Sequence, residues 1–380
     1  MLIRRKSQIS FVNAVLRNID REGRSRLGAT SIIDNVDPWL ADSWLQQYGK
    51  DTTQKIVEAA MMQSPVFITV NHLVAHDPNG GERLPTPTSQ KDGTIERLKQ
   101  MKDLFTTTDD EGDPQPAELL PVGSIRIPDN FGGAVSKWPL YDEGAWWVQD
   151  VSATLPAIAL YNELSKNLGE KQLEDMHVVD LCSAPGGKTA QLCSMGFGKV
   201  DAVEISARRS RSLHKNMKRL GMEDICNVIV VDGREFVPDT VTVPVQGVLV
   251  DAPCSATGVG SRRPDVLQKS IDIEDLTSIQ RQLSIHAVDN ILQVGGILVY
   301  ATCSLLKQEG EDQIEWLLNE KRSDTSSTCL ETLPFTQDEI PGFNDCIDKN
   351  GWLRVIPGIL PGSLQFCDGF FVARLRKISK

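Results

Sequence analysis

Two cysteines and one glycine-rich loop are the residues of this sequence whose types and spacing could do chemistry. Cys254 lies in DAPCSATG (251–258), Cys303 lies in YATCS (300–304), and both follow the loop DLCSAPGGKTAQL (180–192). A thiolate that adds to carbon 6 of a cytosine makes carbon 5 nucleophilic, so that carbon 5 can take up a methyl group. Two thiols downstream of a cofactor-type loop are what methylation of a pyrimidine carbon requires.

The glycine-rich loop predicts a site for a nucleoside-containing cofactor. Its glycines let a ligand approach the backbone, and the free N–H groups of the helix that follows favour an anionic group such as a carboxylate. Glu204 stands 24 residues after Asp180, close to the offset at which an acid binds ribose hydroxyls. The loop is neither GxGxxG nor GxxxxGK[ST], so S-adenosylmethionine fits better than a dinucleotide or a nucleoside triphosphate. Asp232 ends the next predicted strand and could contact the adenine amino group, or be only a turn or cap residue.

The predicted reacting site combines an acid with the two thiols. Asp251 can hydrogen-bond the ring nitrogen of a cytosine, and protonation of that nitrogen makes the ring a better electrophile. A lone buried cysteine is usually a small apolar residue, but Cys254 and Cys303 lie at neighbouring strand ends beside a methyl-donor loop. We expect no metal, because the eight cysteines show neither a CxxC pair nor regular spacing, which also argues against a disulfide framework.

From about residue 144 the sequence alternates between apolar strands, loops and helices. This alternation predicts right-handed βαβ units and a parallel sheet covered on both faces, with ligands at the carboxyl ends of the strands. The predicted strands are 176–182, 199–205, 226–232, 245–251 and 295–303, and the predicted helices are about 188–195, 207–220, 274–293 and 308–319.

The first part of the chain has a different pattern. Strands alternate there with helices around polar loops, which suggests a small α+β module. We expect a basic amphipathic helix in residues 1–30, two helices in 37–62, strands at 66–71 and 123–127, and a helix at 89–105.

The charge balance requires any nucleic-acid contact to be local. The chain has 40 basic and 51 acidic residues, a formal charge of −11, whereas a nucleic-acid binder usually carries a basic surface. No run of about 18 apolar residues occurs, so no membrane segment is expected. Three basic clusters are candidate RNA contacts, with a solvated helix face as the alternative for the first: Arg208, Arg209, Arg211, Lys215, Lys218 and Arg219; Arg262 and Arg263; and Arg374, Arg376, Lys377 and Lys380.

Six ordered motifs resemble those of the Sun/RsmB (NOP/Sun) family of RNA cytosine-5 methyltransferases. With EGAWWVQDVSA (143–153) before them, the resemblance covers about residues 143–380. It implies an α/β fold, namely the Rossmann-like sheet of an S-adenosylmethionine-dependent methyltransferase. The motifs are DLCSAPGGKT, VEIS followed by NMKRLG, VVDGREF, LVDAPCSATGVGSRRPD, GGILVYATCS and DGFFVARL.

The resemblance also implies a role for each matching residue. Cys303 would be the nucleophile, Cys254 would help to release the methylated product, and Asp251 would orient or protonate the base and contact the cofactor. DNA cytosine methyltransferases use the cysteine of their proline-cysteine motif, which leaves attack by Cys254 as the alternative. The residues expected to hold S-adenosylmethionine are Cys182, Ser183, Ala184, Pro185, Gly186, Gly187, Lys188, Glu204, Asp232 and Asp251, and Arg209 matches a family arginine after the ribose-binding acid.

Two positions depart from the family pattern. Ser261 stands before Arg262 and Arg263, so only Arg262 matches an expected arginine pair cleanly, and Gly310 replaces an expected asparagine in QEGED. Both departures concern the expected RNA contacts.

FVNAVLRNI (11–19) resembles the last helix of the NusB-like RNA-binding domain found in the small-subunit ribosomal RNA branch of the family. We therefore expect a NusB-like remnant at 1–30, linker helices and a small α+β RNA-binding module at 31–143, and the methyltransferase domain at 144–380. The basic amino terminus could instead be an organelle transit peptide. The expected location is the cytoplasm, or a plastid or mitochondrion in that second case.

The implied activity is methylation of carbon 5 of a cytosine in RNA through a covalent cysteine–cytosine intermediate. Ribosomal RNA is the first candidate substrate and transfer RNA the second, and the family implies a monomer. A non-catalytic RNA-binding or ribosome-assembly protein on a methyltransferase scaffold is one alternative, since a fold alone does not prove activity. A small-molecule methyltransferase is another, although it would leave the two cysteines and the amino-terminal module unexplained.

Overall fold

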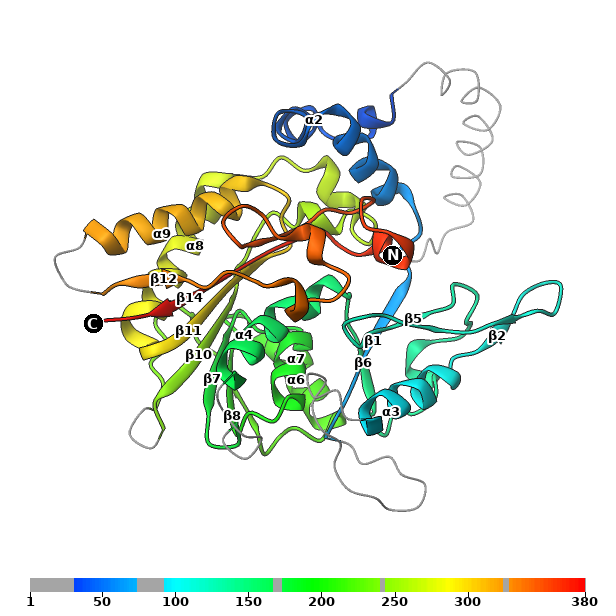
Figure 1. Ribbon diagram of the computed structural model, residues 1–380, viewed down its shortest axis with the longest axis horizontal. Coiled ribbons are helices and arrows are strands. Elements are labelled where there is room, and N and C mark those ends of the chain that lie inside the picture. Colours follow the sequence, from blue (N-terminus) through cyan, green and yellow to red (C-terminus); the bar gives the residue numbers. More distant parts are fainter. Residues whose placement is uncertain (1–30, 74–91, 167–172, 240–242, 324–327, 380) are drawn as a thin grey trace, which may run out of the picture.

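The computed structural model describes residues 31–73, 92–166, 173–239, 243–323 and 328–379. The predicted helix at 1–30, with its NusB-like resemblance and the transit-peptide alternative, lies outside them. The described chain forms an eight-stranded sheet with helices on both faces, and a four-stranded sheet beside it (Figure 1). No helix in these ranges is long and apolar enough to cross a membrane.

The five strands predicted for the large sheet are all present, and they run parallel to one another. Their order is β11-β10-β7-β8-β9. The first of these strands, β7, lies in the middle of the sheet. The next two, β8 and β9, lie on one side of it, and β10 and β11 lie on the other. The strand order therefore reverses between β7 and β10, and such a reversal opens a crevice at the carboxyl ends of the two strands. The strands are β7 (His177–Leu181), β8 (Lys199–Val203), β9 (Cys226–Ile229), β10 (Val245–Asp251) and β11 (Leu292–Thr302).

The prediction of a parallel sheet is wrong at one edge, where the sheet is mixed. The motif DGFFVARL forms β14 (Phe370–Lys377), which lies antiparallel to β11, with Tyr300 opposite Ala373. Two short strands, β12 (Leu330–Thr332) and β13 (Leu353–Val355), pair with β14 in turn. Because β14 returns antiparallel to its neighbour, it needs no helical crossover, and the βαβ pattern of the sequence did not extend to it.

Helices cover both faces of the large sheet because its strands are apolar on both sides. On β7, Val178 packs into the core cluster on one face and Val179 into the cluster on the other. α8 ends earlier than predicted, since a π-helical turn, Ala287–Ile291, leads directly into β11. The first face is covered by α4 (Leu155–Ser165), α6 (Gly187–Ser194) and α7 (Ala207–Arg219), and the second by α8 (Ile273–His286) and α9 (Glu311–Ser323).

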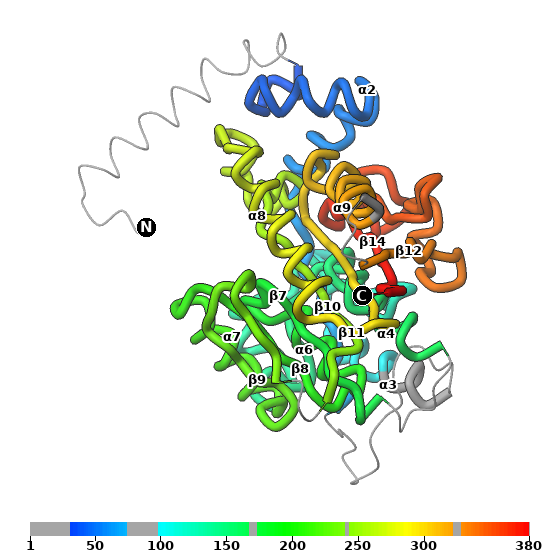
Figure 2. The backbone as a smooth tube through the Cα atoms, turned by 90° about the vertical axis from the view of Figure 1, so that its left-hand side faces the viewer, coloured from blue at the N-terminus to red at the C-terminus, as the bar shows by residue number. Residues whose placement is uncertain are grey.

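The first described α-helix, α2 (Pro38–Met61), lies beyond the end of the large sheet that carries the loops after β10 and β11 (Figures 1 and 2). It is broken at Gly49, whose φ of 76° and ψ of 171° are not helical, so the two predicted helices are two halves of one kinked segment. The Tyr48 hydroxyl donates to the Leu305 carbonyl at 2.5 Å, and Asp37 N donates to the Leu267 carbonyl at 2.8 Å. α2 is thereby fixed to the loops after β10 and β11.

The small sheet has the order β4-β5-β1-β6 and is antiparallel. Its β6 lies within the range predicted for the catalytic domain, and the division of the chain into 31–143 and 144–380 stays a prediction. The elements of this module are β1 (Val66–Val70), α3 (Asp92–Asp103), the hairpin β2 (Thr107–Thr108) and β3 (Pro114–Gln115), β4 (Glu118–Leu119), β5 (Ile125–Ile127) and β6 (Trp146–Val148).

Side chains at the boundary join the small module to the helices of the large sheet. The Asn71 amide donates to the carbonyls of Gly144 and Leu220, at 2.9 and 3.0 Å. The Arg219 guanidinium lies 4.1 Å from the centre of the Tyr141 ring and donates to the Tyr141 carbonyl at 2.8 Å. The module is therefore attached directly to the end of α7.

Candidate active site

The predicted cofactor loop connects β7 to α6. Gly186 has a φ of 104°, and a Cβ at this position would lie 2.4 Å from Leu213 Cδ1, so only glycine fits the turn. The bond between Ala184 and Pro185 is cis. α6 begins at Gly187 without a side-chain cap, so no side chain takes up the N–H groups of its first turn. This is the arrangement that favours an anionic ligand group.

Glu204 lies against this loop, as its spacing predicted. Its buried carboxylate accepts hydrogen bonds from Ala184 N at 3.3 Å and from Ser206 N at 2.8 Å. The Arg209 guanidinium lies 3.5 Å from the same carboxylate and also donates to the Ala184 carbonyl. The acid at the end of β8 and the loop after β7 are thus held together.

Asp180 is completely buried beneath the loop. Its Oδ2 accepts a hydrogen bond from Thr189 Oγ1 at 2.6 Å, and its Oδ1 has no hydrogen-bond partner among the described residues. Burial raises the pKa of Asp180 to about 7. At neutral pH this carboxyl group is therefore close to half protonated.

Asp232 is placed differently from the other predicted cofactor residues. β9 ends at Ile229, and the Asp232 carboxylate accepts hydrogen bonds from Arg234 N at 2.9 Å and from Arg234 Nε at 3.0 Å. These bonds to Arg234 lower the pKa of Asp232. In this structure Asp232 is engaged as a turn residue, which was the alternative interpretation of its position.

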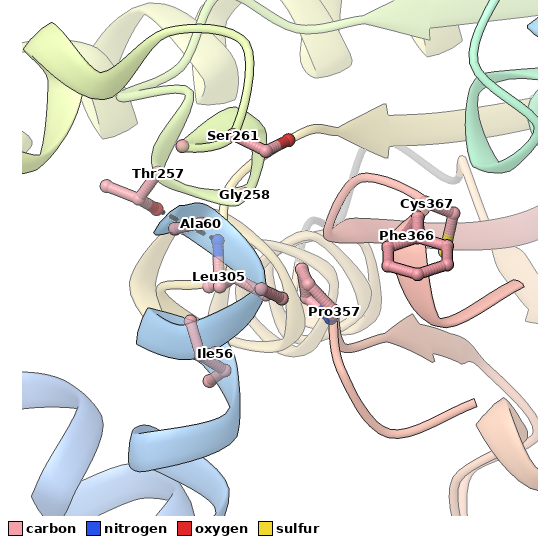
Figure 3. Close-up of a pocket in the computed structure, with 11 residues that line it drawn as sticks. Ile56, Ala60, Thr257, Gly258, Ser261, Leu305, Pro357, Phe366 and Cys367 are labelled. Carbon is pink, nitrogen blue, oxygen red and sulfur yellow. Dashed lines mark hydrogen bonds between the residues drawn. The ribbon is translucent and has the colours of Figure 1, made fainter. Parts of the chain in front are cut away.

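The two predicted cysteines lie side by side: Cys254 Sγ is 3.5 Å from Cys303 Sγ. Their loops are pressed together, because Gly258 N donates to the Cys303 carbonyl at 2.9 Å and a Cβ at Gly258 would lie 2.8 Å from that oxygen. The Leu305 N–H donates to Thr257 Oγ1 at 3.0 Å, the bond dashed in Figure 3. The close-up places these loops against the end of α2.

Lys188 and Asp251 form the charged part of the site. Lys188 Nζ lies 2.8 Å from Asp251 Oδ2 and 5.0 Å from the centre of the Phe370 ring. Burial alone would lower the pKa of Lys188, but the Asp251 carboxylate outweighs burial and the pKa is raised. Lys188 therefore carries a positive charge between the cofactor loop and the cysteines.

The surroundings distinguish the two thiols. The hydrogen bond between the sulfurs raises the pKa of Cys254, and burial raises it further. The same hydrogen bond lowers the pKa of Cys303; burial and the Asp251 carboxylate oppose this, and the charge of Lys188 lowers it as well. The direction of these shifts is the one expected if Cys303 supplies the thiolate.

Two buried acids beside the site were not singled out from the sequence. The Arg262 guanidinium forms an ion pair with Asp368 and lies 3.8 Å from Asp150 Oδ2. Burial raises the pKa of Asp150, and the charge of Arg262 opposes it. Both acids lie inside the sequence motifs QDVSA and DGFF. The motifs alone, however, do not show which basic side chain will form an ion pair with these acids in the folded protein. The side chain of Arg262, expected to contact RNA, is directed at these acids and is 36% exposed.

The other basic clusters differ in exposure. In the carboxyl-terminal cluster, the prediction of a surface contact is wrong for Arg374 and Lys377: Arg374 is completely buried and lies 2.8 Å from Glu339, and Lys377 is buried too. Lys380 lies outside the described residues. Arg376 pairs with Glu163 at 2.5 Å. The cluster on α7 stays on the surface, apart from the half-buried Arg219. Arg209 is exposed but also makes the contact with Glu204 described above.

All eight cysteines are free thiols in the structure. In the described ranges, no group of three or more His, Cys, Asp or Glu side chains could hold a metal ion.

Comparisons with known proteins agree with this architecture. The chain resembles in fold a methyltransferase homolog protein from Pyrococcus horikoshii, with a TM-score of 0.63 and 22% identity over 91% of this chain and 99% of that one. NSun6 from Pyrococcus horikoshii, in a crystal structure with SFG, has a TM-score of 0.59 and 20% identity over 89% of this chain and 97% of that one. These similarities establish the Rossmann-like fold.

The sequence comparisons are more specific. Ribosomal RNA small subunit methyltransferase F of Citrobacter koseri is 36% identical over 242 residues, which are 62% of this chain and 45% of that protein. The protein of the same name from Escherichia coli O1:K1 / APEC is 34% identical over 241 residues, with the same shares. The chain spans about half the length of the curated relatives it matches.

The family model for the 16S rRNA methyltransferases RsmB/F matches residues 169–376, which is more than half of the chain. The matched range contains the cofactor loop, Glu204, Asp251 and both cysteines of the site. It confirms the resemblance to the Sun/RsmB family that the ordered motifs indicated. The chain belongs to the 16S rRNA methyltransferase RsmB/F family.

Proposed function

We propose that the protein methylates carbon 5 of a cytosine in RNA and that S-adenosylmethionine is the methyl donor. One observation carries this proposal: two thiols lie 3.5 Å apart at the ends of neighbouring strands, next to an ion pair of Lys188 and Asp251. Methylation of a pyrimidine carbon needs a nucleophile, a proton donor and a second group for product release, and these residues supply all three.

The residues around the cofactor loop fit S-adenosylmethionine. The uncapped start of α6 suits the carboxylate of the methionine portion, and Glu204 lies where it can accept hydrogen bonds from ribose hydroxyls. Ile205 is 62% exposed beside Glu204, which leaves an apolar surface for a flat ring. When bound, S-adenosylmethionine supplies the methyl group.

The reaction at the base follows from the site. The Cys303 thiolate adds to carbon 6 of the cytosine, and the Lys188–Asp251 pair offers a proton to the ring nitrogen, so that carbon 5 gains electron density. After carbon 5 is methylated, it loses its proton to a base, and the bond between carbon 6 and the sulfur breaks to release the Cys303 thiolate. The double bond between carbons 5 and 6 is restored, and the ring nitrogen returns its proton to the Lys188–Asp251 pair. Cys254, a thiol next to that bond, is placed to assist the release.

The exposed cations of α7 support RNA as the substrate. Arg208, Arg211, Lys215 and Lys218 repeat at intervals of three, four and three residues, which puts them on one side of the helix, and all four are exposed. The helix contains no acidic residue, in a chain whose formal charge is −11. Such a stripe suits the phosphates of an RNA backbone.

The names of the curated relatives favour ribosomal RNA over transfer RNA as the substrate. A single-stranded or loop cytosine is the better target, because extrusion of a base from a duplex costs a few kcal/mol. A monomeric state and a cytoplasmic location stay predictions.

The test uses the two cysteine variants separately. Cys254→Ala and Cys303→Ala are incubated with small-subunit ribosomal RNA and labelled S-adenosylmethionine, and protein bound covalently to RNA is detected on denaturing gels while methylcytosine is mapped. We expect an accumulated adduct with Cys254→Ala, and neither adduct nor product with Cys303→Ala. Cys329→Ala, remote from the site in the fold, serves as the matched control.

The opposite pattern would assign the attack to Cys254. No methylation of ribosomal or transfer RNA by the unaltered protein would favour the scaffold or the small-molecule alternative.

A further inference from the structure

Glu309 is a fully buried carboxylate that lies between the two cysteine loops. It ends a short 3-10 helix, Lys307–Glu309, after β11, and is 0% exposed. Its Oε1 accepts hydrogen bonds from Ser255 N at 2.9 Å and from Gln280 Nε2 at 3.0 Å. Its Oε2 accepts hydrogen bonds from Ser255 Oγ at 2.5 Å and from Ser304 Oγ at 2.6 Å.

The donors on these loops are the direct neighbours of the catalytic cysteines. Ser255 follows Cys254, and Ser304 follows Cys303, so each serine is one peptide bond from a reacting residue. The two serine hydroxyls lie 3.1 Å apart beneath the pair of sulfurs. A shift of either serine would move the sulfur beside it.

A second layer of hydrogen bonds fixes Glu309 itself. Gln280, on α8, donates to the Pro253 carbonyl at 3.0 Å as well as to Glu309. The Tyr300 hydroxyl lies 3.2 Å from Gln280 Oε1 and donates to the Glu309 carbonyl oxygen at 2.8 Å. Both side chains are completely buried. α8 and β11 therefore help to hold Glu309 in place, in addition to the loops that its carboxylate contacts.

We infer that Glu309 is a positioning residue whose carboxylate joins the Cys254 loop to the Cys303 loop and so sets the distance between the two sulfurs. The inference deepens the proposed function, on which its catalytic meaning rests. The rate at which the two thiols form a disulfide depends on this distance and can be measured without any methyl transfer.

The chemistry of the site explains why a carboxylate is needed here. Four donors point at the side chain, and an ionised carboxylate is the group that only accepts. Among the described residues no Lys, Arg or His forms a salt bridge with Glu309, so neutral donors alone bind it. A negative charge beside a thiol disfavours the thiolate, so Glu309 does not activate the cysteines. What it contributes is their position.

The experiment measures how fast the two thiols can be joined. Diamide takes two hydrogen atoms from the pair and is reduced to the hydrazine, while Cys254 and Cys303 form a disulfide. The full chain is treated with diamide in the absence of RNA, the remaining thiols are alkylated, and the linked peptides are quantified by mass spectrometry. We expect rapid linkage in the unaltered protein, and linkage slower by at least about tenfold in Glu309→Ala, because the oriented pair is lost.

Steady-state kinetics on RNA supply the second readout. In Glu309→Ala we expect kcat to fall by about 100-fold with KM within about threefold, the result of misplaced reacting groups. Glu309→Gln keeps one acceptor oxygen but places an amide NH2 where the second oxygen accepts hydrogen bonds, so its linkage rate should fall between those of Glu309→Ala and the unaltered protein. Glu315→Gln, an exposed position on α9, is the control and should match the unaltered protein in both assays.

If Glu309→Ala does not fold, Ser255→Ala and Ser304→Ala remove one donor from each loop and should each slow linkage several-fold. A linkage rate that is unchanged in folded Glu309→Ala, or in both serine variants, would overturn the inference. A rise in KM with kcat unchanged would also overturn it, because it would indicate lost RNA binding and not misplaced reacting groups. If the unaltered protein methylates no RNA but its linkage rate depends on Glu309, the proposed function fails and the positioning role stands.

Discussion

The two sides of the crevice are built in different ways. We call the loop after β7 together with Glu204 the cofactor half, and the loops that carry Cys254 and Cys303 the cysteine half. Hydrogen bonds in the cofactor half span two residues, from Ser206 to Glu204, or twenty, from Ala184 to Glu204. Those in the cysteine half span 49 residues between the sulfurs and 54 between Ser255 and Glu309. Local sequence thus shapes the first half, and the tertiary fold shapes the second.

This difference predicts that substitutions can impair ligand binding and the rate of reaction independently of each other. Backbone N–H groups hold the acid of the cofactor half, so a change there should weaken ligand binding and leave the thiols in place. Buried side chains hold the cysteine half, so a change there should slow the reaction and leave ligand binding intact. Lys188 belongs to both, because it lies on α6 and pairs with Asp251 on β10.

The largest effect is expected for Lys188→Met, which removes this link. We expect kcat to fall by about 1,000-fold, the usual scale for loss of a group that handles a proton. Because the charge of Lys188 helps to lower the pKa of Cys303, the midpoint of Cys303 alkylation should move to higher pH. Alkylation by iodoacetamide between pH 6 and 10 measures this, with exposed Lys349→Met as the control. An unchanged midpoint would show that the charge of Lys188 does not affect the pKa of Cys303.

The next largest effect concerns Asp180 and stability. Its pKa is raised to about 7 by burial, so between about pH 4 and 7 the folded protein keeps a proton that the unfolded chain has released. The free energy of unfolding therefore falls as pH rises through this window, by about 3 kcal/mol from this group. Asp180→Asn cannot ionise, and its stability relative to the unaltered protein should rise from pH 4 to pH 7.

Urea unfolding at several pH values across this window compares the two proteins. Parallel stability curves would show that Asp180 is ionised in the folded state and would contradict the prediction.

A smaller effect is expected for Glu204→Gln, which tests the cofactor half alone. The Kd for S-adenosylmethionine should rise by about 10- to 100-fold, the range for loss of a hydrogen bond to a charged group. At saturating S-adenosylmethionine, kcat and the diamide linkage rate should stay near those of the unaltered protein. Calorimetry measures the Kd, and Glu223→Gln is the exposed control. A change in linkage rate would mean that the halves are not independent.

The smallest effect is expected outside both halves, on α7. The double variant Arg211→Glu, Lys215→Glu should weaken RNA binding by about tenfold. The slope of the logarithm of the binding constant against the logarithm of salt concentration should fall by the amount expected for the loss of about two phosphate contacts. The Kd for S-adenosylmethionine should not change. RNA binding at several salt concentrations provides the measurement, and Lys349→Glu is the matched surface control. An unchanged salt slope would show that α7 is only a solvated face.

The sequence predicted the positions of the loop after β7 and of Glu204 well, because the contacts between them are local. The five parallel strands, the loop before α6 and the Glu204 offset could all be found from patterns within about thirty residues. The neighbouring positions of Cys254 and Cys303 could be inferred only because both stand at the carboxyl ends of strands.

The remaining features depend on partners that are distant in the sequence. Nothing near Arg262 shows that Asp150 and Asp368 will meet it from either end of the catalytic region. Nothing near Glu309 shows that its carboxylate will meet Ser255. Asp232 is an exception, because its partner Arg234 is only two residues away; strand patterns do not show which side chain will pair within so short a turn.

The attachment of the small module has a consequence for how a substrate can be held. Asn71 bonds to the end of α7, Arg219 stacks on Tyr141, and β6 runs directly into the segment that carries Asp150. These three anchors attach the small sheet to the part of the chain that carries the thiols. An RNA that touches both must adapt its own backbone to a fixed span, so the protein would select its target by the reach and flexibility of the RNA around the cytosine.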